Sequence, residues 1–258
     1  MRIMKRVFAC LAISSLLLVA GCHSHSVKPV SEEPSVKLLS ANAYNNFAVE
    51  LRKKGDVERA IDYYNKALEI DPRHAMAYNN RGVAWKFKGD IERAIADYQE
   101  AMEIDPLLAA AYNNRGVIYG IQGNYPRAIA YYNKALGLDV YNADFYNNRG
   151  VARELKGDVD DAIDNYTMAL KINSEHAYAY NNRGAAFRVK GVYDRAIDDY
   201  TMAIELNPGY ADAYYNRGIA WHAKGDMRQA RADIKKALSL NPKNTRYQLF
   251  LSYLKDKK

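Results

Sequence analysis

The sequence predicts an all-α solenoid made of six copies of one helical pair. The signature Tyr-x-Asn-Arg-Gly recurs every 34 residues, beginning at Tyr78, Tyr112, Tyr146, Tyr180 and Tyr214, with a degenerate copy at Tyr44. A second glycine follows each signature, and two alanines seven residues apart come later in the period. A fixed period of this length is typical of chains in which one supersecondary unit stacks on the next. Such stacking produces an extended binding surface, because each unit touches only its neighbours.

The first half of each unit is predicted to be a helix that ends at a glycine. We number each unit so that the signature tyrosine is position 4; the small residue of the signature is then position 8. The glycine at position 15 can supply the left-handed residue that ends a helix, and the Asp or Asn that usually follows can cap the next helix. Position 15 is Gly55, Gly89, Gly123, Gly157, Gly191 and Gly225.

The second half of each unit is predicted to be a helix packed closely against the first. Small residues at positions 8, 20 and 27 allow close approach, and large residues at 4, 11, 24 and 28 fill the space between. Position 24 is Tyr64, Tyr98, Tyr132, Tyr166 and Tyr200 in five of the six units. Proline at position 32, which cannot continue a helix, ends the pair in four units: Pro72, Pro106, Pro208 and Pro242.

This pattern resembles the tetratricopeptide repeat. The resemblance covers about residues 41–242 and implies a right-handed superhelical solenoid of six helix-turn-helix repeats. The repeats would span 41–74, 75–108, 109–142, 143–176, 177–210 and 211–242, and residues 243–258 would form a capping helix and a basic tail. The fourth repeat departs most from the pattern, with Phe145 and Arg153 at two of its signature positions. This departure predicts weaker packing near the middle of the array.

Residues 1–21 are interpreted as a signal peptide. Three basic residues precede an apolar stretch from Val7 to Ala20, which is shorter than the ~20 residues of a stable membrane span. The segment Leu18–Cys22 resembles the bacterial lipobox, which implies lipidation at Cys22 and a membrane anchor, followed by a flexible tether over residues 22–40. His23 stands where Asp retains many such lipoproteins in the inner membrane, so the resemblance favours the periplasmic face of the outer membrane.

Composition excludes several functional classes. The net charge of +7 includes the three bases of residues 1–21, and the +4 that remains forms no clustered basic face, so nucleic acid is not an expected partner. Cys10 would leave with the signal and Cys22 would carry lipid, so no disulfide is expected. The five histidines form no metal or catalytic set, and no phosphate-binding motif is present. We therefore expect no cofactor, no metal and no enzymatic activity.

The family resemblance implies that helix positions 2, 5, 9, 12 and 13 line a concave groove. Position 5 carries primary amides, which can pair with both halves of a peptide unit, or these amides can be structural filler. The row is Asn45, Asn79, Asn113, Asn147 and Asn181, with Tyr215 in the last repeat. The amides at position 6 are expected to join repeats.

Apolar and basic residues complete the predicted groove. Position 9 includes Val83, Val117 and Val151, where the chaperone-tail receptors of this family use Asn, so that class is not favoured. Arg52 and Lys86 at position 12 make the first third of the groove basic. The prediction is an extended peptide segment whose acidic end lies toward the first repeats.

A further row has two interpretations. Arginine recurs at position 7 as Arg81, Arg115, Arg149, Arg183 and Arg217. A charged side chain at a partly buried site needs a partner, and the recurring Asp or Asn at position 31, such as Asp71, is the partner we expect. The favoured interpretation is a structural ladder between repeats, and the alternative is a ladder that binds carboxylates or phosphates of a ligand.

The predicted function is that of a membrane-anchored scaffold that binds other envelope proteins through its concave surface. Resemblance to the lipoprotein pilotins of type IV pili provides one alternative, a factor that assists secretin or pilus assembly. A carrier of envelope polysaccharide, with Tyr and Asn as sugar platforms, provides another. Association of two copies through the terminal repeats is also possible.

Overall fold

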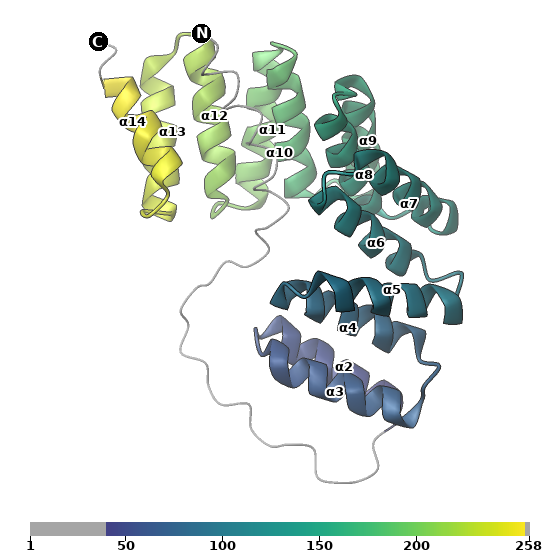
Figure 1. The fold of residues 1–258 in the computed structure, drawn as a ribbon. Helices are drawn as coiled ribbons and strands as arrows, with labels where there is room; N and C mark the ends of the chain where they lie inside the picture. Colours follow the sequence, from purple (N-terminus) through teal and green to yellow (C-terminus); the bar gives the residue numbers. More distant parts are fainter. Residues whose placement is uncertain (1–39, 256–258) are drawn as a thin grey trace. The chain divides into compact units, whose positions relative to one another are not determined.

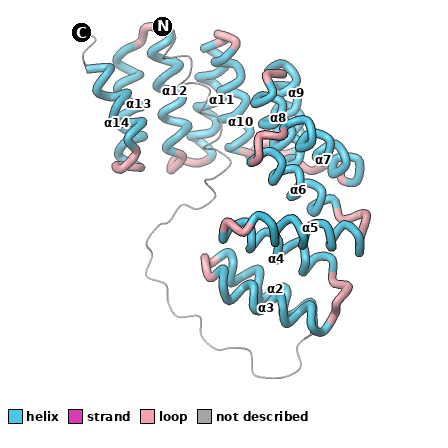
Figure 2. Tube along the Cα trace, viewed as in Figure 1, coloured by secondary structure: helices cyan, strands magenta, loops and turns pink. Residues whose placement is uncertain are grey.

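The computed structural model describes residues 40–255, which form thirteen α-helices and no strand (Figures 1 and 2). The all-α repeat architecture predicted from the sequence is confirmed. The predicted signal peptide, the lipidation at Cys22 and the tether up to residue 39 lie outside the described residues. The chain divides into two compact units, one ending at Val140 and the other beginning at Tyr141.

Unit 1 contains three helical pairs. The first helices of the pairs, the A helices, are α2 (Ala41–Lys53), α4 (Ala75–Lys88) and α6 (Ala109–Ile121). The second helices, the B helices, are α3 (Val57–Ile70), α5 (Ile91–Ile104) and α7 (Tyr125–Leu138). Each helix contacts the next one along the chain, and α4 also contacts both α2 and α6. The A helices of unit 1 therefore form one continuous face.

Unit 2 contains three further pairs and a final helix. Its A helices are α8 (Ala143–Lys156), α10 (Ala177–Val189) and α12 (Ala211–Ala223). Its B helices are α9 (Val159–Ile172), α11 (Tyr193–Leu206) and α13 (Met227–Leu240), and α14 (Thr245–Lys255) follows. Helix α10 contacts both α8 and α12, so the A helices of this unit also adjoin one another.

The core of the four middle pairs is a tyrosine ring packed against a glycine, whereas the first pair has Ala48 in place of the glycine and the last has Ile234 in place of the tyrosine. A Cβ added at Gly116 would lie 2.7 Å from Tyr132 Cε1, and one added at Gly150 would lie 2.6 Å from Tyr166 Cε1. The position 24 tyrosines are at most 2% exposed, and every alanine at positions 20 and 27 is fully buried. The predicted roles of positions 8, 20, 24 and 27 in close helix packing are thus confirmed.

The turn between the two helices of a pair follows the prediction as well. Gly89 has φ +83°, and the glycines at position 15 of the other repeats also have positive φ, the region where a side chain would be strained. The next residue then caps helix B: the Asp90 carboxylate accepts a hydrogen bond from the Arg93 backbone N–H at 3.1 Å. Together these residues end one helix and begin the next within three residues.

Helix α14 closes the last repeat of unit 2. Tyr247 is buried and stacks on Tyr215 with ring centroids 4.9 Å apart, and Leu254 is also fully buried. Leu249 is exposed, whereas the other outward residues of the helix, such as Gln248 and Ser252, are polar. The helix therefore covers an apolar face that a further repeat would otherwise cover. In the described part of the chain, no helix combines the length and apolar character needed to cross a bilayer.

Candidate partner-binding face

The A helices present a row of exposed apolar side chains at position 13. Phe87 of α4 and Ile121 of α6 are 47% and 41% exposed, and Val189 of α10 is also exposed. We call the residues at positions 5, 9, 12 and 13 of the A helices the A-helix face. Within unit 1, and separately within unit 2, the exposed apolar side chains of this face are available for contact with a partner.

The valines at position 9 lie beneath this exposed row. Val83 packs against the core around Tyr98 and Ile118, and Val151 packs against the core around Tyr166. Val117 is buried. These side chains therefore pack in the core of the repeats and contribute little exposed apolar surface to the A-helix face.

The asparagines at position 5 join neighbouring repeats. The Asn45, Asn79 and Asn113 side chains are only 4–8% exposed. The Asn45 Oδ1 accepts a hydrogen bond from Asn80 Nδ2 at 3.0 Å, and the Asn79 Oδ1 accepts one from Asn114 Nδ2 at 2.8 Å. In unit 2, Asn147 and Asn181 accept in the same way from the position 6 amides of the following repeats, at 3.0 and 2.9 Å.

This geometry gives both amide rows a part in the repeat-to-repeat contact, whereas the sequence interpretation assigned that role to position 6. The carbonyl oxygens of Asn45, Asn79, Asn147 and Asn181 are occupied, so a peptide backbone could use them only by sharing them. The part of these amides in peptide binding stays a prediction. Tyr215, the last member of the row, is buried against α14.

The arginine ladder at position 7 makes ion pairs within the protein. Arg183 donates through Nε and Nη2 to the two carboxylate oxygens of Asp199 at 2.9 and 2.8 Å, and through Nη1 to Thr167 of the preceding repeat at 3.2 Å. Hydrogen bonding to Asp199 raises the pKa of Arg183. Arg81 makes the same set of bonds with Asp97 and Asn65, and Arg217 with Asp233 and Thr201.

The prediction that these arginines pair with position 31 was wrong. Asp71 at position 31 ends helix α3 and accepts from the Arg73 backbone N–H instead. The actual partner is position 23, which follows the arginine by 16 residues on the opposite helix of the same pair. Asp97 and Asp199, which lie on B helices, are therefore buried. The structural interpretation of the ladder is supported for the three paired arginines.

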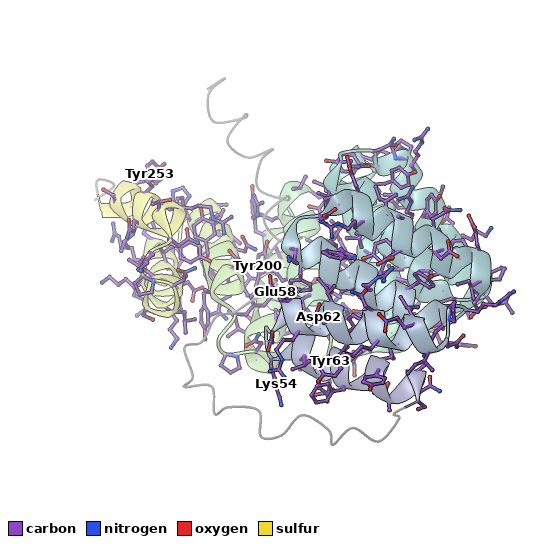
Figure 3. The ribbon with its side chains drawn as sticks, turned by 60° about the horizontal axis from the view of Figure 1, so that its bottom comes forward. Lys54, Glu58, Asp62, Tyr63, Tyr200 and Tyr253 are labelled. Carbon is purple, nitrogen blue, oxygen red and sulfur yellow. The ribbon has the colours of Figure 1, made fainter. Side chains whose placement is uncertain are left out.

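Arg115 in the third repeat differs from the rest. Tyr131 occupies position 23 there, and the buried Nε and Nη1 of Arg115 have no hydrogen-bond partner among the described residues. Repeat 1 also has a tyrosine at position 23, Tyr63, which is labelled in Figure 3, but its position 7 is Phe47 instead of arginine. The rings of Phe47 and Tyr63 are 4.6 Å apart. The ion pair is thus replaced by an aromatic contact in repeat 1 but left incomplete in repeat 3.

Position 12 forms a charged row beside the exposed apolar residues. In unit 1, Arg52 and Lys86 are half-buried neighbours, and neither forms an ion pair within the described residues. Burial and the adjacent Arg52 charge lower the pKa of Lys86. The fully buried Tyr64 and Tyr98 lie beside Arg52, and the Arg52 charge opposes the rise in pKa that burial causes at both hydroxyls.

The same row in unit 2 includes an acid. The Tyr166 hydroxyl donates to Glu154 Oε2 at 2.8 Å. Burial raises the pKa of Glu154, and the hydrogen bond from Tyr166 and the charge of Arg188 partly oppose that rise. Arg188 also lies beside the hydroxyl of Tyr200, which is labelled in Figure 3. Unit 2 therefore places opposite charges at position 12, where unit 1 places two cations.

Sequence reasoning assigned the tyrosines at position 24 to the core and missed their second role. Their rings fill the helix pair, while their hydroxyls reach the position 12 side chains of the A-helix face. The available signal was that Arg52, Glu154 and Arg188 each precede such a tyrosine by 12 residues.

Two histidines also have a role that was missed. His74 and His176 cap α4 and α10 by accepting from the backbone N–H groups of Ala77 and Ala179 at 3.3 and 3.2 Å. The other ring nitrogen of His176 faces Asp144 at 3.1 Å, and that of His74 faces Asn42 at 2.9 Å. The hydrogen bond from His176 lowers the pKa of Asp144.

Comparison with known families identifies the repeat. A model described as tetratricopeptide repeat matches residues 41–74, 109–142, 143–176 and 211–244. Two related models, described as TPR repeat and tetratricopeptide repeat, match residues 88–123 and 184–225, and residues 63–96, respectively. Comparison with curated proteins found no match.

Solved structures share the fold. A chain of the APC/C hetero-tetramer Cut9–Hcn1 is similar with a TM-score of 0.78 and 21% identity over 83% of this chain, which spans 43% of that one. PilW, described as a widely conserved type IV pilus biogenesis factor, is similar with a TM-score of 0.74 and 20% identity, covering 82% of this chain and 98% of PilW. YrrB, described as a TPR protein with an unusual peptide-binding site, has 26% identity and a TM-score of 0.55, covering 72% and 95%.

Proposed function

The chain belongs to the tetratricopeptide repeat family, and from this premise we propose that it is a membrane-anchored scaffold that binds extended segments of other envelope proteins. The observation that carries the proposal is the exposed apolar row of the A-helix face, Phe87 and Ile121 above all. Exposed apolar side chains that adjoin one another on a surface are typical of an interaction site. The peptide-binding site of YrrB, a protein with the same repeat, supports a peptide as the ligand.

The apolar row and the charged row together suit an extended peptide. Phe87 follows Lys86 directly in α4, so apolar contact and charge lie side by side along the same helix. In unit 2, α8 and α10 repeat this arrangement with Glu154–Leu155 and Arg188–Val189, whereas the first and third A helices of unit 1 keep only its charged half and its apolar half, respectively. A segment running across the A helices would then place alternate side chains on apolar and polar positions.

The test is a crosslinking capture from envelopes with Phe87→Ser and Ile121→Ser combined in one chain. Loss of the captured partner is expected, because these substitutions remove the largest apolar contacts of the A-helix face in unit 1. The matched control combines Ile70→Ser and Leu138→Ser, which change exposed apolar residues of B helices in the same unit. Equal capture by both variants would contradict binding at the A-helix face.

The membrane anchor is tested separately. We expect Cys22→Ala to abolish incorporation of labelled palmitate and to release the chain from the membrane fraction. Retention of label after this substitution would contradict anchoring at Cys22, and fractionation of the unaltered chain would identify the membrane.

The identity of a captured partner distinguishes the scaffold from the pilus-assembly alternative. The likeness to PilW concerns the fold alone, so a secretin or pilus subunit among the captured proteins would be needed to favour that alternative. Capture of polysaccharide without protein would favour the carrier.

A further inference from the structure

Hydrogen-bond donors without partners gather at position 12 in unit 1. Arg52 Nε and the Tyr98 hydroxyl are buried without a hydrogen-bond partner within the described part of the chain. The buried Tyr64 hydroxyl proton has no acceptor there, because its neighbour is the Arg52 guanidinium, which can only donate. Lys86, half-buried beside Arg52, adds a second positive charge. Buried polar groups are nearly always paired, so a group of unpaired donors around two like charges requires a physical reason.

Unit 2 holds a carboxylate in the same arrangement, although Arg188 Nε and the Tyr200 hydroxyl proton find no acceptor among the described residues there either. There the carboxylate of Glu154 stands at position 12 and accepts a hydrogen bond from the Tyr166 hydroxyl at 2.8 Å. The positive charge of Arg188 also interacts with this carboxylate. Tyr64 and Tyr98 are the counterparts of Tyr166, but the residues at position 12 of their repeats are cations. Unit 1 thus has the donors of this arrangement without the acceptor.

We propose that the cluster of Arg52, Lys86, Tyr64 and Tyr98 binds a carboxylate supplied by the partner segment. The proposal rests on the function proposed above and specifies the chemistry of the segment. The carboxylate belongs either to an acidic side chain or to the carboxyl end of a chain, since the two present the same acceptor. Arg52 and Lys86 form the accessible side of the cluster, because both remain partly exposed whereas the tyrosine rings are buried.

Binding of a carboxylate would relieve a repulsion that the free protein carries. Two half-buried cations disfavour each other, and an anion between them replaces repulsion by attraction. Charge-assisted hydrogen bonds of this kind are about twice as strong as neutral ones. The unpaired cluster therefore does not stabilise the folded state of the free protein, and substitution of its two cations should not unfold the protein.

The first experiment compares two double variants of the full lipidated chain in the envelope capture. Arg52→Met and Lys86→Met together are expected to reduce capture at least tenfold. Lys54→Met and Lys66→Met together remove the same charge at exposed positions of unit 1 that lie outside the A-helix face, and they are expected to change capture by less than about twofold. The Arg52 and Lys86 variant should melt at or above the temperature of the unaltered chain, which separates loss of binding from loss of folding.

The outcomes distinguish the two levels of the proposal. If the unaltered chain captures no protein, the proposed scaffold function fails. If it captures a partner and the Arg52 and Lys86 variant captures that partner equally well, the carboxylate site is overturned and the scaffold function stands.

A second experiment identifies the source of the carboxylate. Side-chain resonances of Lys86 are followed by NMR during titration with three peptides: Ac-Ala-Ala-Glu-Ala-Ala-NH₂, its Gln counterpart, and acetylated Ala₅ with a free carboxyl end. Saturable shifts with the Glu peptide assign an acidic side chain, and shifts with only the free-ended peptide assign a chain terminus. Absence of shifts with both carboxylate peptides, or equal shifts with the Gln peptide, would overturn the site.

Discussion

At the scale of single residues, an arginine at position 7 joins the two helices of a repeat by its ion pair with the aspartate at position 23. We call this pair the arginine clamp. The Arg183 guanidinium binds both oxygens of Asp199 and also reaches the preceding repeat, so one side chain ties three helices. The sequence displayed the arginine clearly but not its partner. The relevant spacing of 16 residues crosses a turn, and only the packed pair shows which helix B residue faces position 7.

Because of the clamp, substitutions at two adjacent aspartates of α11 should lower the stability of the protein by different amounts. Asp199→Asn should destabilise the protein by about 2 kcal/mol, because it leaves the partly buried Arg183 without its carboxylate. Asp198 is exposed, so Asp198→Asn should change stability by less than about 0.5 kcal/mol. Urea unfolding of the two variants measures the difference, and equal effects would show that the clamp contributes little.

The incomplete clamp in repeat 3 predicts a stabilising substitution. Tyr131→Asp should stabilise unit 1 by about 1 kcal/mol, because an acceptor for Arg115 outweighs the loss of the ring contacts of Tyr131 with Tyr119 and Tyr112. The control is Tyr63→Asp in repeat 1, where position 7 is Phe47. The new carboxylate would be buried without an arginine to pair with, so this variant should be destabilised by about 3 kcal/mol. Thermal unfolding compares the two, and a loss of stability in both would refute the role given to Arg115.

The half-buried Glu154 predicts a dependence of stability on pH. Burial raises its pKa in the folded protein, so the folded state holds a proton that the unfolded state has released. Stability contributed by this group therefore falls as pH rises from about 4.3, its unfolded value, through the raised pKa. Glu154→Gln should be more stable than the unaltered chain at pH 7, with the difference vanishing near pH 4. Denaturant unfolding at both pH values tests this, and a constant difference would contradict it.

At the scale of elements, a glycine at position 8 allows the two helices to approach closely in five of the six pairs. A side chain at position 8 would overlap the tyrosine ring of the partner helix in four repeats and Ile234 in the last. This was predictable, because the alternation of small and large residues recurs at the same positions in every repeat. The degenerate first copy, with Ala48 opposite Tyr64, shows that the distance can adjust by one methyl group.

Two glycines of α6 provide a matched test of this packing. Gly116→Ala should cost about 2 kcal/mol, because its Cβ would lie 2.7 Å from the Tyr132 ring. Gly120→Ala should instead stabilise by about 0.5–1 kcal/mol, because the only nearby atom is the Tyr132 hydroxyl at 3.9 Å and alanine is the better helix former. Circular dichroism during thermal unfolding measures both, and a destabilising Gly120→Ala would argue against purely local packing.

On the scale of the whole molecule, the chain consists of two units of three repeats each, with α14 completing the second. The division falls after Val140, next to the fourth repeat, where the sequence departs most from its pattern. That repeat is nonetheless packed, with Phe145 buried in α8. Stability in such arrays is approximately a sum over repeats and their neighbours, so a change at one end should remain local.

Removal of residues 245–258 tests this locality. The truncation exposes Tyr215 and Ile234, which α14 covers, so amide protons of α12 and α13 should exchange much faster. Protection in unit 1 should remain unchanged. Hydrogen exchange followed by mass spectrometry reports both regions, and a loss of protection across the entire chain would show that the array unfolds as one cooperative body.

The sequence by itself determined the repeat, its period, its turns and its small-to-large core positions, because each of these depends on contacts within 34 residues that recur six times. Only the tertiary structure decided where polar side chains find partners. It assigned Asp199 to Arg183, it placed the position 5 asparagines in contact with the next repeat, and it brought tyrosine hydroxyls beside Arg52. Apolar packing follows a period that a sequence displays directly, whereas a hydrogen bond depends on which atoms of two separate helices come within about 3 Å.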